Sequence, residues 1–546
     1  MACFGASDVE FSRVIRHRGA WTEMMGRQRR QVSFKDIQVW ADAPIVPEDS
    51  FYGQMAARGD QLVREEWFAE LYSDRGRPSV SPVLLTKVLL LMFHDNVSDR
   101  QAEESARYDL RWKSALGLGI DEVGFDATAL SRFRARLVLN EKEREFLERT
   151  VKAAKEYGLI QAQVAEVVDS TPVLGAGAVQ DTYNLLKSAN RKVLKVIRTR
   201  EDCQPLLEQL MRKDYDEPGK PDINWEDPQA QKELLGELVS DARTLLKATE
   251  RLSLEAGERA ARELLAAVAE QDIVEQPDGT VELKDGVAKD RVISTTDPEM
   301  RHGRKSSKGR FNGYKAHIME SVEGEIITGV AVTAANVPDA EPLSELLEQQ
   351  SKAGITATEV LGDTAYGSGD TRVEMAERGV KLIAPVPPEV KGEVFLKSAF
   401  DIDLTARTCR CPAGHTVKLK GHHKPGESGR FEFGALCREC PLRGQCTKSK
   451  TGRVVVIHRH EEYLQQGRAE QRTDAFKERY RKRPRVERKI AELTHHHGMR
   501  KARYIGDERI RLQVAWTAAV VNLKRIFKHL QGGSVPKMRL GPVVTV

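Results

Sequence analysis

The spacing of apolar and polar residues predicts helices at both ends of the chain and a sheet between them. Residues 80–137 have helical periodicity, in which the apolar stretch Val83–Phe93 precedes a polar-faced helix that reaches Tyr108. Asp126 can cap a further helix, and three arginines recur in it as in helices that meet DNA: Arg132, Arg134 and Arg136. We therefore expect an N-terminal helical DNA-binding domain over residues 1–150, with an ordinary helical bundle as the alternative.

Two of the predicted strands end on an aspartate, Asp169 and Asp363. The β-rich runs that predict strands are Val164–Val168, Tyr314–Ser321, Ile326–Thr333, Thr358–Gly362 and Val380–Pro385. The second and third runs are joined by a short turn and predict a hairpin. Helical periodicity fills two of the intervals, Asp339–Lys352 and Thr371–Arg378. This order predicts an α/β (α+β) fold, a mixed sheet flanked by helices, in which functional groups gather at strand ends.

Helical periodicity also predicts an insertion and a helical C-terminal part. Residues 185–290 have charged helix faces and form an insertion whose function the sequence does not reveal. Near the C-terminus, Pro484 opens a helix, since proline in a first turn gives up no hydrogen bond. The stripe that this helix buries repeats at helical spacing: Val486, Ile490 and Leu493. Glu487 lies one residue round from that stripe, so it can border the core and still point into a cleft.

Composition and charge favour a polyanionic partner. The chain of 546 residues, 40% of them hydrophobic, is long enough for several domains, and its net charge is +5. The stretches Arg301–Lys315 and Lys477–Arg511 are strongly basic, which suits nucleic acid, although a solvated surface is the alternative. The N-terminus lacks a secretory signal, and the longest apolar run, Val88–Phe93, is too short to span a bilayer. We expect a cytoplasmic protein with no membrane partner.

Three acidic residues predict a metal-dependent phosphoryl-transfer site. Two strands that end on aspartate and a helix that presents a glutamate beside arginines supply Asp169, Asp363 and Glu487. Mg²⁺ or Mn²⁺ prefers such carboxylate oxygens, and two ions about 3.5 to 4 Å apart can serve an in-line displacement at phosphorus. We therefore expect the three carboxylates to converge and hold two ions. A lone aspartate after a strand is more often a capping residue.

The motifs around these acids resemble the three signatures of bacterial insertion-sequence DDE transposases. They read Asp169-Ser170-Thr171, Asp363-Thr364-Ala365-Tyr366-Gly367-Ser368 and Tyr480-x-x-Arg483-x-x-x-Glu487. The resemblance implies an RNase H-like catalytic domain in three parts, residues 160–184, 291–395 and 459–531, followed by a tail over residues 532–546. It also implies an enzyme that binds terminal inverted repeats, cuts the transposon ends and joins the freed 3′ hydroxyl to target DNA. A homodimer on DNA, acting at the bacterial nucleoid, is the expected species.

The same resemblance implies that Tyr480 and Arg483 bind phosphates of the transposon end. The family pattern continues with a lysine seven residues beyond the glutamate, where this chain has Thr494. Nearby residues that could supply replacement charge are Lys489, His495, His496, His497, Arg500 and Lys501. The other cations that we expect at DNA are Arg488, Arg304, Lys305, Lys308, Arg310 and Lys315.

Five of the seven cysteines fall between Cys409 and Cys446 and predict a structural zinc site. Short spacers with proline or glycine form knuckles that hold tetrahedral Zn²⁺ through thiolates. The ligand set that we expect, with Cys409 left spare, is Cys411, Cys437, Cys440 and Cys446. Ordinary reduced cysteines and a redox role are the alternatives. Residues 400–458 would then be a small zinc-ribbon-like insert.

Two other functions fit the same scaffold. One is an RNase H-like nuclease that cuts DNA without joining it, and the other is a domesticated DNA-binding regulator with an inactive site. The presence of all three acids in their sequence context disfavours the regulator. A reaction with end-containing DNA separates the three, because a transposase joins, a nuclease only cuts and a regulator only binds.

Overall fold

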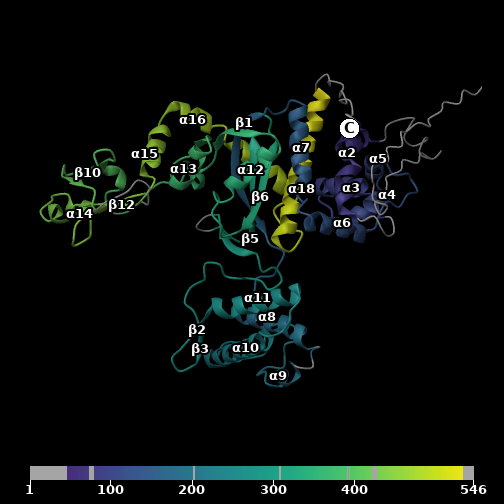
Figure 1. Cartoon of the computed structure of the whole chain (residues 1–546), viewed down its shortest axis with the longest axis horizontal. Coiled ribbons are helices and arrows are strands. Elements are labelled where there is room, and N and C mark those ends of the chain that lie inside the picture. Colours follow the sequence, from purple (N-terminus) through teal and green to yellow (C-terminus); the bar gives the residue numbers. More distant parts are fainter. Residues whose placement is uncertain are drawn as a thin grey trace, which may run out of the picture. The chain divides into compact units, whose positions relative to one another are not determined.

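The structure is a computed structural model, and its chain divides into two compact units. One unit comprises Met1–Glu143 with Leu530–Val546, and the other is Arg144–His529. The described residues are 46–72, 79–198, 200, 203–305, 309–389, 392, 394–420 and 427–532 (Figure 1). Lys308, the first 45 residues of the predicted N-terminal domain and all but Gly532 of the predicted tail lie outside them. None of the helices in the described ranges is both long enough and apolar enough to cross a bilayer.

The first unit is helical, and capping residues set where several of its helices begin. Ser81, Ser98 and Asp126 each accept a hydrogen bond from a backbone N–H in the first turn of the helix that follows. Residues 82–93 are buried without interruption, so this stretch forms the centre of the unit. The helices are α2 (Phe51–Leu62), η1 (Glu65–Leu71), α3 (Pro82–Asp95), α4 (Asp99–Tyr108), α5 (Leu110–Leu116) and α6 (Ala127–Leu139).

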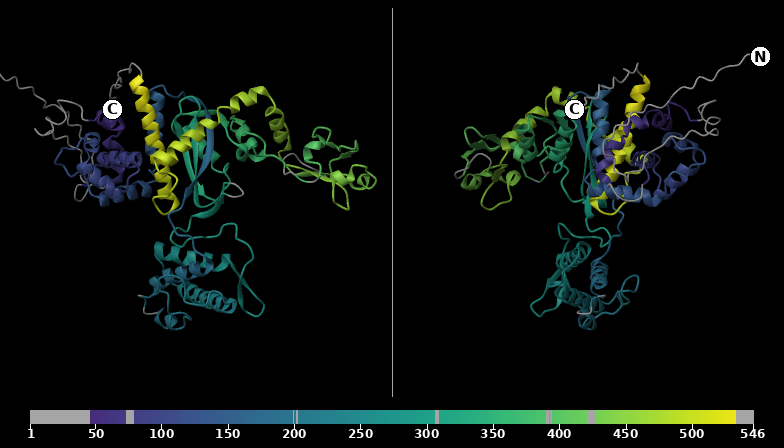
Figure 2. Two further views of the ribbon diagram at one scale, coloured as in Figure 1. Left: turned by 180° about the vertical axis from the view of Figure 1, so that it is seen from behind. Right: turned by 45° about the vertical axis from the view of Figure 1, so that its right-hand side comes forward.

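The second unit contains a six-stranded mixed sheet (Figures 1 and 2). Its strands are β1 (Gln163–Leu174), β4 (Arg301–Arg304), β5 (Arg310–Ser321), β6 (Ile327–Ala334), β7 (Thr356–Leu361) and β8 (Lys381–Ile383). β5 runs antiparallel to β1, and β7 and β8 run parallel to it. β6 and β4 both pair with the far edge of β5. The predicted hairpin is thus present, and the mixed sheet has the RNase H-like order that the sequence resemblance implied.

One predicted strand boundary is wrong. β1 does not stop at Asp169 but continues to Leu174, because its antiparallel pairing with β5 extends to Leu174 opposite Gly313. Pro172 is tolerated inside this extension because β7 pairs with β1 only as far as Val167, which leaves one edge of the strand free of β7. Asp169 therefore lies within a strand, whereas Asp363 follows the end of β7 as predicted.

Helices cover both faces of the sheet. Val168 packs into a core with α12 (Leu343–Lys352) and α13 (Gly369–Glu377), and its neighbour Asp169 points to the opposite face. On that opposite face, α17 (Pro484–Ala491) contacts β1 and β5. The long helix α18 (Asp507–Gly532) is fixed by Asn522, which bonds to both backbone groups of Ile327 in β6 and to Thr150 of α7 (Glu145–Glu156). Glu487 thus lies on a helix that packs against the strand carrying Asp169.

Two inserted segments each have a hydrophobic core of their own. The first contains the predicted helices and also a short hairpin that the sequence did not predict: α8 (Thr182–Ile197), α9 (Gln204–Glu208), α10 (Pro228–Thr249), α11 (Ala256–Gln271), β2 (Ile273–Glu275) and β3 (Val281–Leu283). The second is the cysteine-rich insert, residues 400–458. Its elements are β9 (Asp401–Asp403), β10 (Thr408–Arg410), β11 (Thr416–Lys418), β12 (Gly429–Glu432), η5 (Gly434–Cys437), α14 (Arg443–Cys446) and β13 (Val454–Ile457).

Candidate active site

Strand pairing brings the two candidate aspartates to one end of the sheet. Val167 of β1 pairs with Leu361 of β7 in the parallel register, and Asp169 and Asp363 each lie two residues further along. Side chains alternate along strands, so Asp169 points to the same face as Val167, and the negative charge of Asp363 contributes to a raised pKa of Asp169. Asp363 also caps the short helix η3 (Thr364–Tyr366), because its carboxylate accepts the N–H of Ala365 at 2.8 Å.

The turn after Asp363 requires glycine at position 367. A Cβ atom at Gly367 would lie 1.8 Å from the carbonyl oxygen of Pro385, well inside van der Waals contact. The glycine lets this turn approach the segment after β8 and so fixes the position of Asp363. The glycine of the sequence motif is thus explained by packing.

Arg483 joins two of the three candidate acids. One guanidinium nitrogen donates to Asp169 Oδ2 at 2.6 Å, and the other donates to Glu487 Oε1 at 2.6 Å. Arg483 precedes α17 and is four residues before Glu487, so both side chains emerge on one side of that helix. The side chains of Arg483 and Asp169 are 16% and 17% exposed, while that of Glu487 is 54% exposed. A mostly buried strand carboxylate and a freer helix carboxylate therefore share one cation.

Tyr480 lies in the electrostatic field of all three acids. It ends α16 (Asp474–Tyr480) and stacks on Phe476 with ring centroids 5.6 Å apart. Burial is the main reason why the pKa of its hydroxyl is raised, and Asp363, Asp169 and Glu487 each add to the rise. The pKa of Asp169 is raised too, mainly by burial and also by Asp363, against the opposing effect of Arg483. The site concentrates negative charge that a cation would relieve.

The carboxylates suit a divalent cation, although they do not form a closed ligand set. Among the described residues, no three His, Cys, Asp or Glu side chains lie together in metal-binding geometry. The guanidinium of Arg483 occupies the space between Asp169 and Glu487, so one positive charge is already accommodated there. Carboxylate oxygens are the ligands that Mg²⁺ and Mn²⁺ prefer. The donor set therefore fits such an ion once Arg483 has moved.

Besides Arg483, four of the predicted DNA-contacting cations are engaged within the protein. Lys315 is on the face of the sheet opposite to Asp169, bonded to Asp339 at 2.7 Å and to the carbonyl of Val337. Lys489 is 10% exposed and lies between two carboxylates, Glu320 at 3.7 Å and Glu492 at 3.8 Å. In the first unit, Arg134 is paired with Asp99, and Arg136 lies over the ring of Tyr72.

The other predicted cations in the described residues are exposed: Arg132, Arg304, Lys305, Arg310, Arg488, Arg500 and Lys501. Arg500 and Lys501 lie beside the end of β1, because the backbone of residues 500–502 bonds to both backbone groups of Leu174. The positive charge of Lys305 acts on Asp169, where it opposes the rise in the carboxyl pKa. Thr494, in place of the family's lysine, turns inward and donates to the carbonyl of Ile490 at 2.8 Å. His495 and His496 beside it are exposed, whereas His497 is buried.

Tyr366 and Arg479 also lie close to the site, although the sequence pattern predicted no role for either residue. Tyr366 is buried, and its hydroxyl has no hydrogen-bond partner in the described residues. Burial is the main reason why its pKa is raised, and the charges of Asp169 and Asp363 add to the rise. Tyr366 lies three residues after Asp363 in a 3₁₀ turn, where side chains three residues apart are eclipsed. This spacing could have indicated that Tyr366 lies near Asp363. Arg479 donates to Glu359 of β7 at 2.6 Å, a pairing across 120 residues that no local pattern indicates.

A buried carboxylate near α17 makes stability depend on pH. Burial raises the pKa of Glu320 to about 7, with Lys489 opposing the rise. The folded pKa exceeds the unfolded one, so the folded state is favoured while Glu320 is protonated, and stability falls as pH rises from about 4.5 to about 7. We expect a loss of roughly 3 kcal/mol at most over this window, at 1.36 kcal/mol for each pKa unit.

Glu320→Gln tests this effect, since the amide cannot ionise. We expect the variant's urea unfolding midpoint at pH 8 to exceed that of the wild type, and the two proteins to converge at pH 5. An equal pH dependence in both proteins would show that Glu320 does not titrate in this range.

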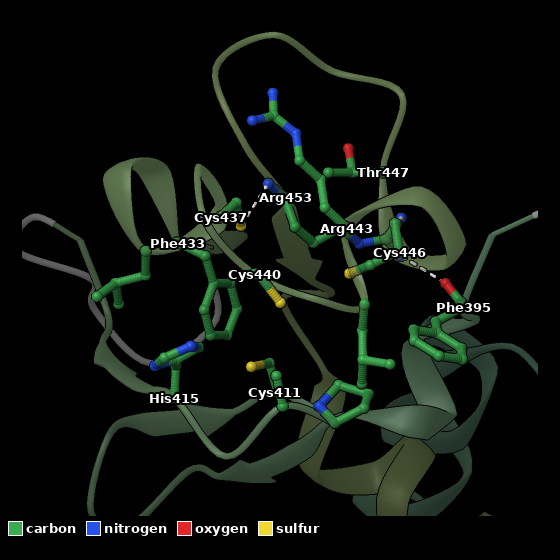
Figure 3. A pocket seen from close by; sticks show the side chains of 14 residues that line it. Phe395, Cys411, His415, Phe433, Cys437, Cys440, Arg443, Cys446, Thr447 and Arg453 are labelled. Carbon is green, nitrogen blue, oxygen red and sulfur yellow. Dashed lines mark hydrogen bonds between the residues drawn. The ribbon is translucent and has the colours of Figure 1, made fainter.

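Four thiols line one pocket in the cysteine-rich insert. Figure 3 shows the sulfurs of Cys411 and Cys440 pointing toward each other, with Cys437 and Cys446 on either side. The backbone N–H of Arg453 donates to the sulfur of Cys437 at 3.4 Å. Cys409 is also buried, but it does not line this pocket. These four cysteines are the ligand set that the sequence predicted. Among the described residues, however, their side chains do not lie together in metal-binding geometry.

Three family models match the chain. A model described as a transposase domain (DUF772) matches residues 43–136. Two models described as transposase DDE domains match residues 284–407 and 410–527. No curated protein and no solved structure matches the chain. The two DDE-domain matches contain Asp363 and Glu487, whereas Asp169 lies outside all three matched segments.

Proposed function

Because this chain belongs to the insertion-sequence DDE transposases, enzymes that cut and transfer DNA with divalent metal ions, we propose that Asp169, Asp363 and Glu487 are its catalytic carboxylates. The observation that carries the proposal is the bridging of Asp169 and Glu487 by Arg483, with Asp363 at the same end of the adjacent strand. Residues 169 and 487 are far apart in sequence, so the fold has brought together the first and third motifs.

Asp169, Asp363 and Glu487 would hold two Mg²⁺ or Mn²⁺ ions. When bound, such ions supply activation of water and stabilisation of the leaving oxygen in an in-line displacement. Asp169 and Asp363 are fixed by a strand and a capped turn, while the exposed carboxylate of Glu487 could adjust once Arg483 releases it. Rigid and adjustable ligands together let one site serve cleavage and strand transfer, which are both phosphoryl transfers.

Arg483 and Tyr480 would orient the scissile phosphate. The planar guanidinium can bind two phosphate oxygens at once, which requires that it leave Asp169 and Glu487. Tyr480 is protonated at neutral pH, as an ordinary tyrosine is, and its raised pKa strengthens this preference, so its hydroxyl can donate to a phosphate. Lys305, Arg500 and Lys501 would extend the contact along the strand.

The substrate is DNA, and we propose terminal inverted repeats and target DNA as the two substrates. The helical region matched by the transposase-domain model would bind the repeats, and its exposed cation Arg132 is available to do so. Two ends must be brought together before transfer, so the active species would be a homodimer acting on nucleoid DNA. Residues 160–184, 291–395 and 459–531 would form the catalytic domain.

The test is a reaction of the purified protein with labelled end-containing DNA, a target plasmid and Mg²⁺ or Mn²⁺. Cleavage at the end followed by joined product is the expected result. Cleavage without joining would assign a nuclease instead, and binding without cleavage would assign a regulator. Scrambled end sequences provide the control, because they should give neither product.

We also propose a structural Zn²⁺ on Cys411, Cys437, Cys440 and Cys446. Four thiols around one pocket are the donor set that zinc prefers, and its binding energy would stabilise an insert whose strands are only three or four residues long. We expect protein from zinc-supplemented cells to contain about one zinc per chain by elemental analysis. Cys440→Ser should lower that content to near zero and expose residues 400–458 to limited proteolysis.

Cys409→Ala is the matched control for zinc. It removes a thiol that is close in sequence to Cys411 but does not line the pocket of the four thiols, so the variant should retain the metal. Zinc-free wild-type protein, or zinc retained by Cys440→Ser, would contradict the assignment.

A further inference from the structure

The cysteine-rich insert carries a larger net positive charge than the whole chain. Residues 400–458 contain eleven Lys and Arg residues and five Asp and Glu residues, a net charge of +6, whereas the full chain carries +5. The other residues together are therefore close to neutral, at −1. A zinc ion with four thiolates would add about two negative charges and still leave the insert positive.

The fold of the insert turns much of this charge outward. Alternation along its short strands buries Cys409, Phe431 and Val455 in the core and exposes the residues beside them. Lys418 at the end of β11 is exposed and lies opposite Thr408, away from any acid on the partner strand. Part of the positive charge is neutralised locally, since Glu432 pairs with both Lys420 and Arg430. The surface cations are therefore not all equivalent.

The segment after Cys446 presents lysine on an ordered loop. Ser449 accepts the N–H of Thr451 at 3.2 Å and donates its own N–H to Thr447, so hydroxyl contacts fix the turn. Arg443 also donates to the carbonyls of Ser449 and Lys450, both at 3.3 Å. The side chain of Lys450 is left exposed at this fixed position. Ordering before binding lowers the entropy cost of a contact.

The exposed cations in the described part of the insert that form no ion pair with an acid in the described residues include Arg410, Lys418, Arg438 and Lys450. The phenylalanine rings of residues 400–458 are buried in the core, so they cannot stack on bases. Lysine and arginine without exposed aromatic rings suit the phosphate backbone and do not read sequence.

We propose that the cysteine-rich insert is a second DNA-binding module, which grips the phosphate backbone without sequence preference and apart from the cleavage site. The inference rests on the proposed function only in taking DNA as the substrate. The role of the insert would be to retain DNA on the enzyme, because phosphate contacts contribute affinity and carry no sequence information.

The salt dependence of DNA binding tests the module in the full-length protein. The variant carries Lys418→Gln, Arg438→Gln and Lys450→Gln, and fluorescence anisotropy measures its affinity for an end-containing duplex and for an unrelated duplex of equal length. The slope of log K against log salt changes by about 0.9 for each phosphate contact. We expect the slope to become shallower by about 2 to 3, equally for both duplexes.

A matched variant in the helical insertion also removes three positive charges. Arg198, Lys232 and Arg243 are each paired with an acid at 2.7 to 2.9 Å, so their replacement by Gln should change the slope by less than about 1. An unchanged slope in the insert variant, an equal change in the control, or a change confined to the end-containing duplex would overturn the proposal. Zinc content and circular dichroism establish that both variants are folded.

End cleavage by the wild-type protein is scored separately at low salt. A wild type that binds but does not cut refutes the proposed function and leaves the slope comparison intact. A wild type that cuts, with an insert variant of unchanged slope, refutes only the module.

Discussion

Asp363→Asn should lower the rate of end cleavage by at least about a thousand-fold, which corresponds to about 4 kcal/mol of lost transition-state stabilisation. The amide removes the negative charge that a divalent cation needs, yet asparagine caps helices as well as aspartate does. Its carbonyl can still accept the N–H of Ala365, so the turn that holds residue 363 should persist. Affinity for end DNA should change less than about two-fold. Single-turnover cleavage and anisotropy measure the two quantities.

Asp370→Asn is the matched control for this substitution. Asp370 lies seven residues further on, in the first turn of α13, and its exposed carboxylate pairs with Arg459. We expect it to retain cleavage near the wild-type rate. Cleavage retained by Asp363→Asn, or loss of its folded structure, would count against the assignment of Asp363 as a metal ligand.

Arg483→Ala should change metal binding and DNA binding in opposite directions. Removing the guanidinium leaves Asp169 and Glu487 without the cation that now joins them, so we expect Mn²⁺ to bind about ten-fold more tightly without DNA, a gain of about 1.4 kcal/mol. The same change removes a phosphate contact and should weaken binding to end DNA about ten-fold. Isothermal titration calorimetry with Mn²⁺ and anisotropy with end DNA supply the two readouts.

Arg479→Ala separates position from charge. Arg479 lies four residues before Arg483 but pairs with Glu359 and does not contact the three acids. Loss of one positive charge at Arg479 should change Mn²⁺ affinity by less than about two-fold. Equal gains in the two variants would mean that Arg483 acts only through the general field, and a loss of Mn²⁺ affinity in Arg483→Ala would refute its competition with the metal.

Features set by neighbouring residues were predictable from the sequence. The caps at Ser98 and Asp126 and the start of α17 at Pro484 depend on hydrogen bonds within one turn, so short patterns reveal them. The hairpin of β5 and β6 and the position of Asp363 after β7 follow from alternation and a nearby turn. The three candidate acids came from motifs, and the structure brings Asp169 and Glu487 to a common partner.

Features set by distant pairing were not predictable. β1 extends past Asp169 because β5, more than a hundred residues later, pairs with it up to Leu174. Lys315 looked like a DNA contact because it ends a basic stretch, but strand register turns it to the opposite face, toward Asp339. Lys489 is enclosed by Glu320 and Glu492, which lie on different elements. Charge in a sequence does not reveal which partner a fold supplies.

The two inserted segments separate the proposed catalytic acids along the chain: the helical insertion lies between Asp169 and Asp363, and the cysteine-rich insert lies between Asp363 and Glu487. During synthesis, each segment can fold around its own core before the next acid leaves the ribosome. Under the proposed assignment, an incomplete product that ends before residue 487 lacks a carboxylate. Fragments from broken messages would then be unable to damage the host chromosome, and cutting would be restricted to nearly complete chains.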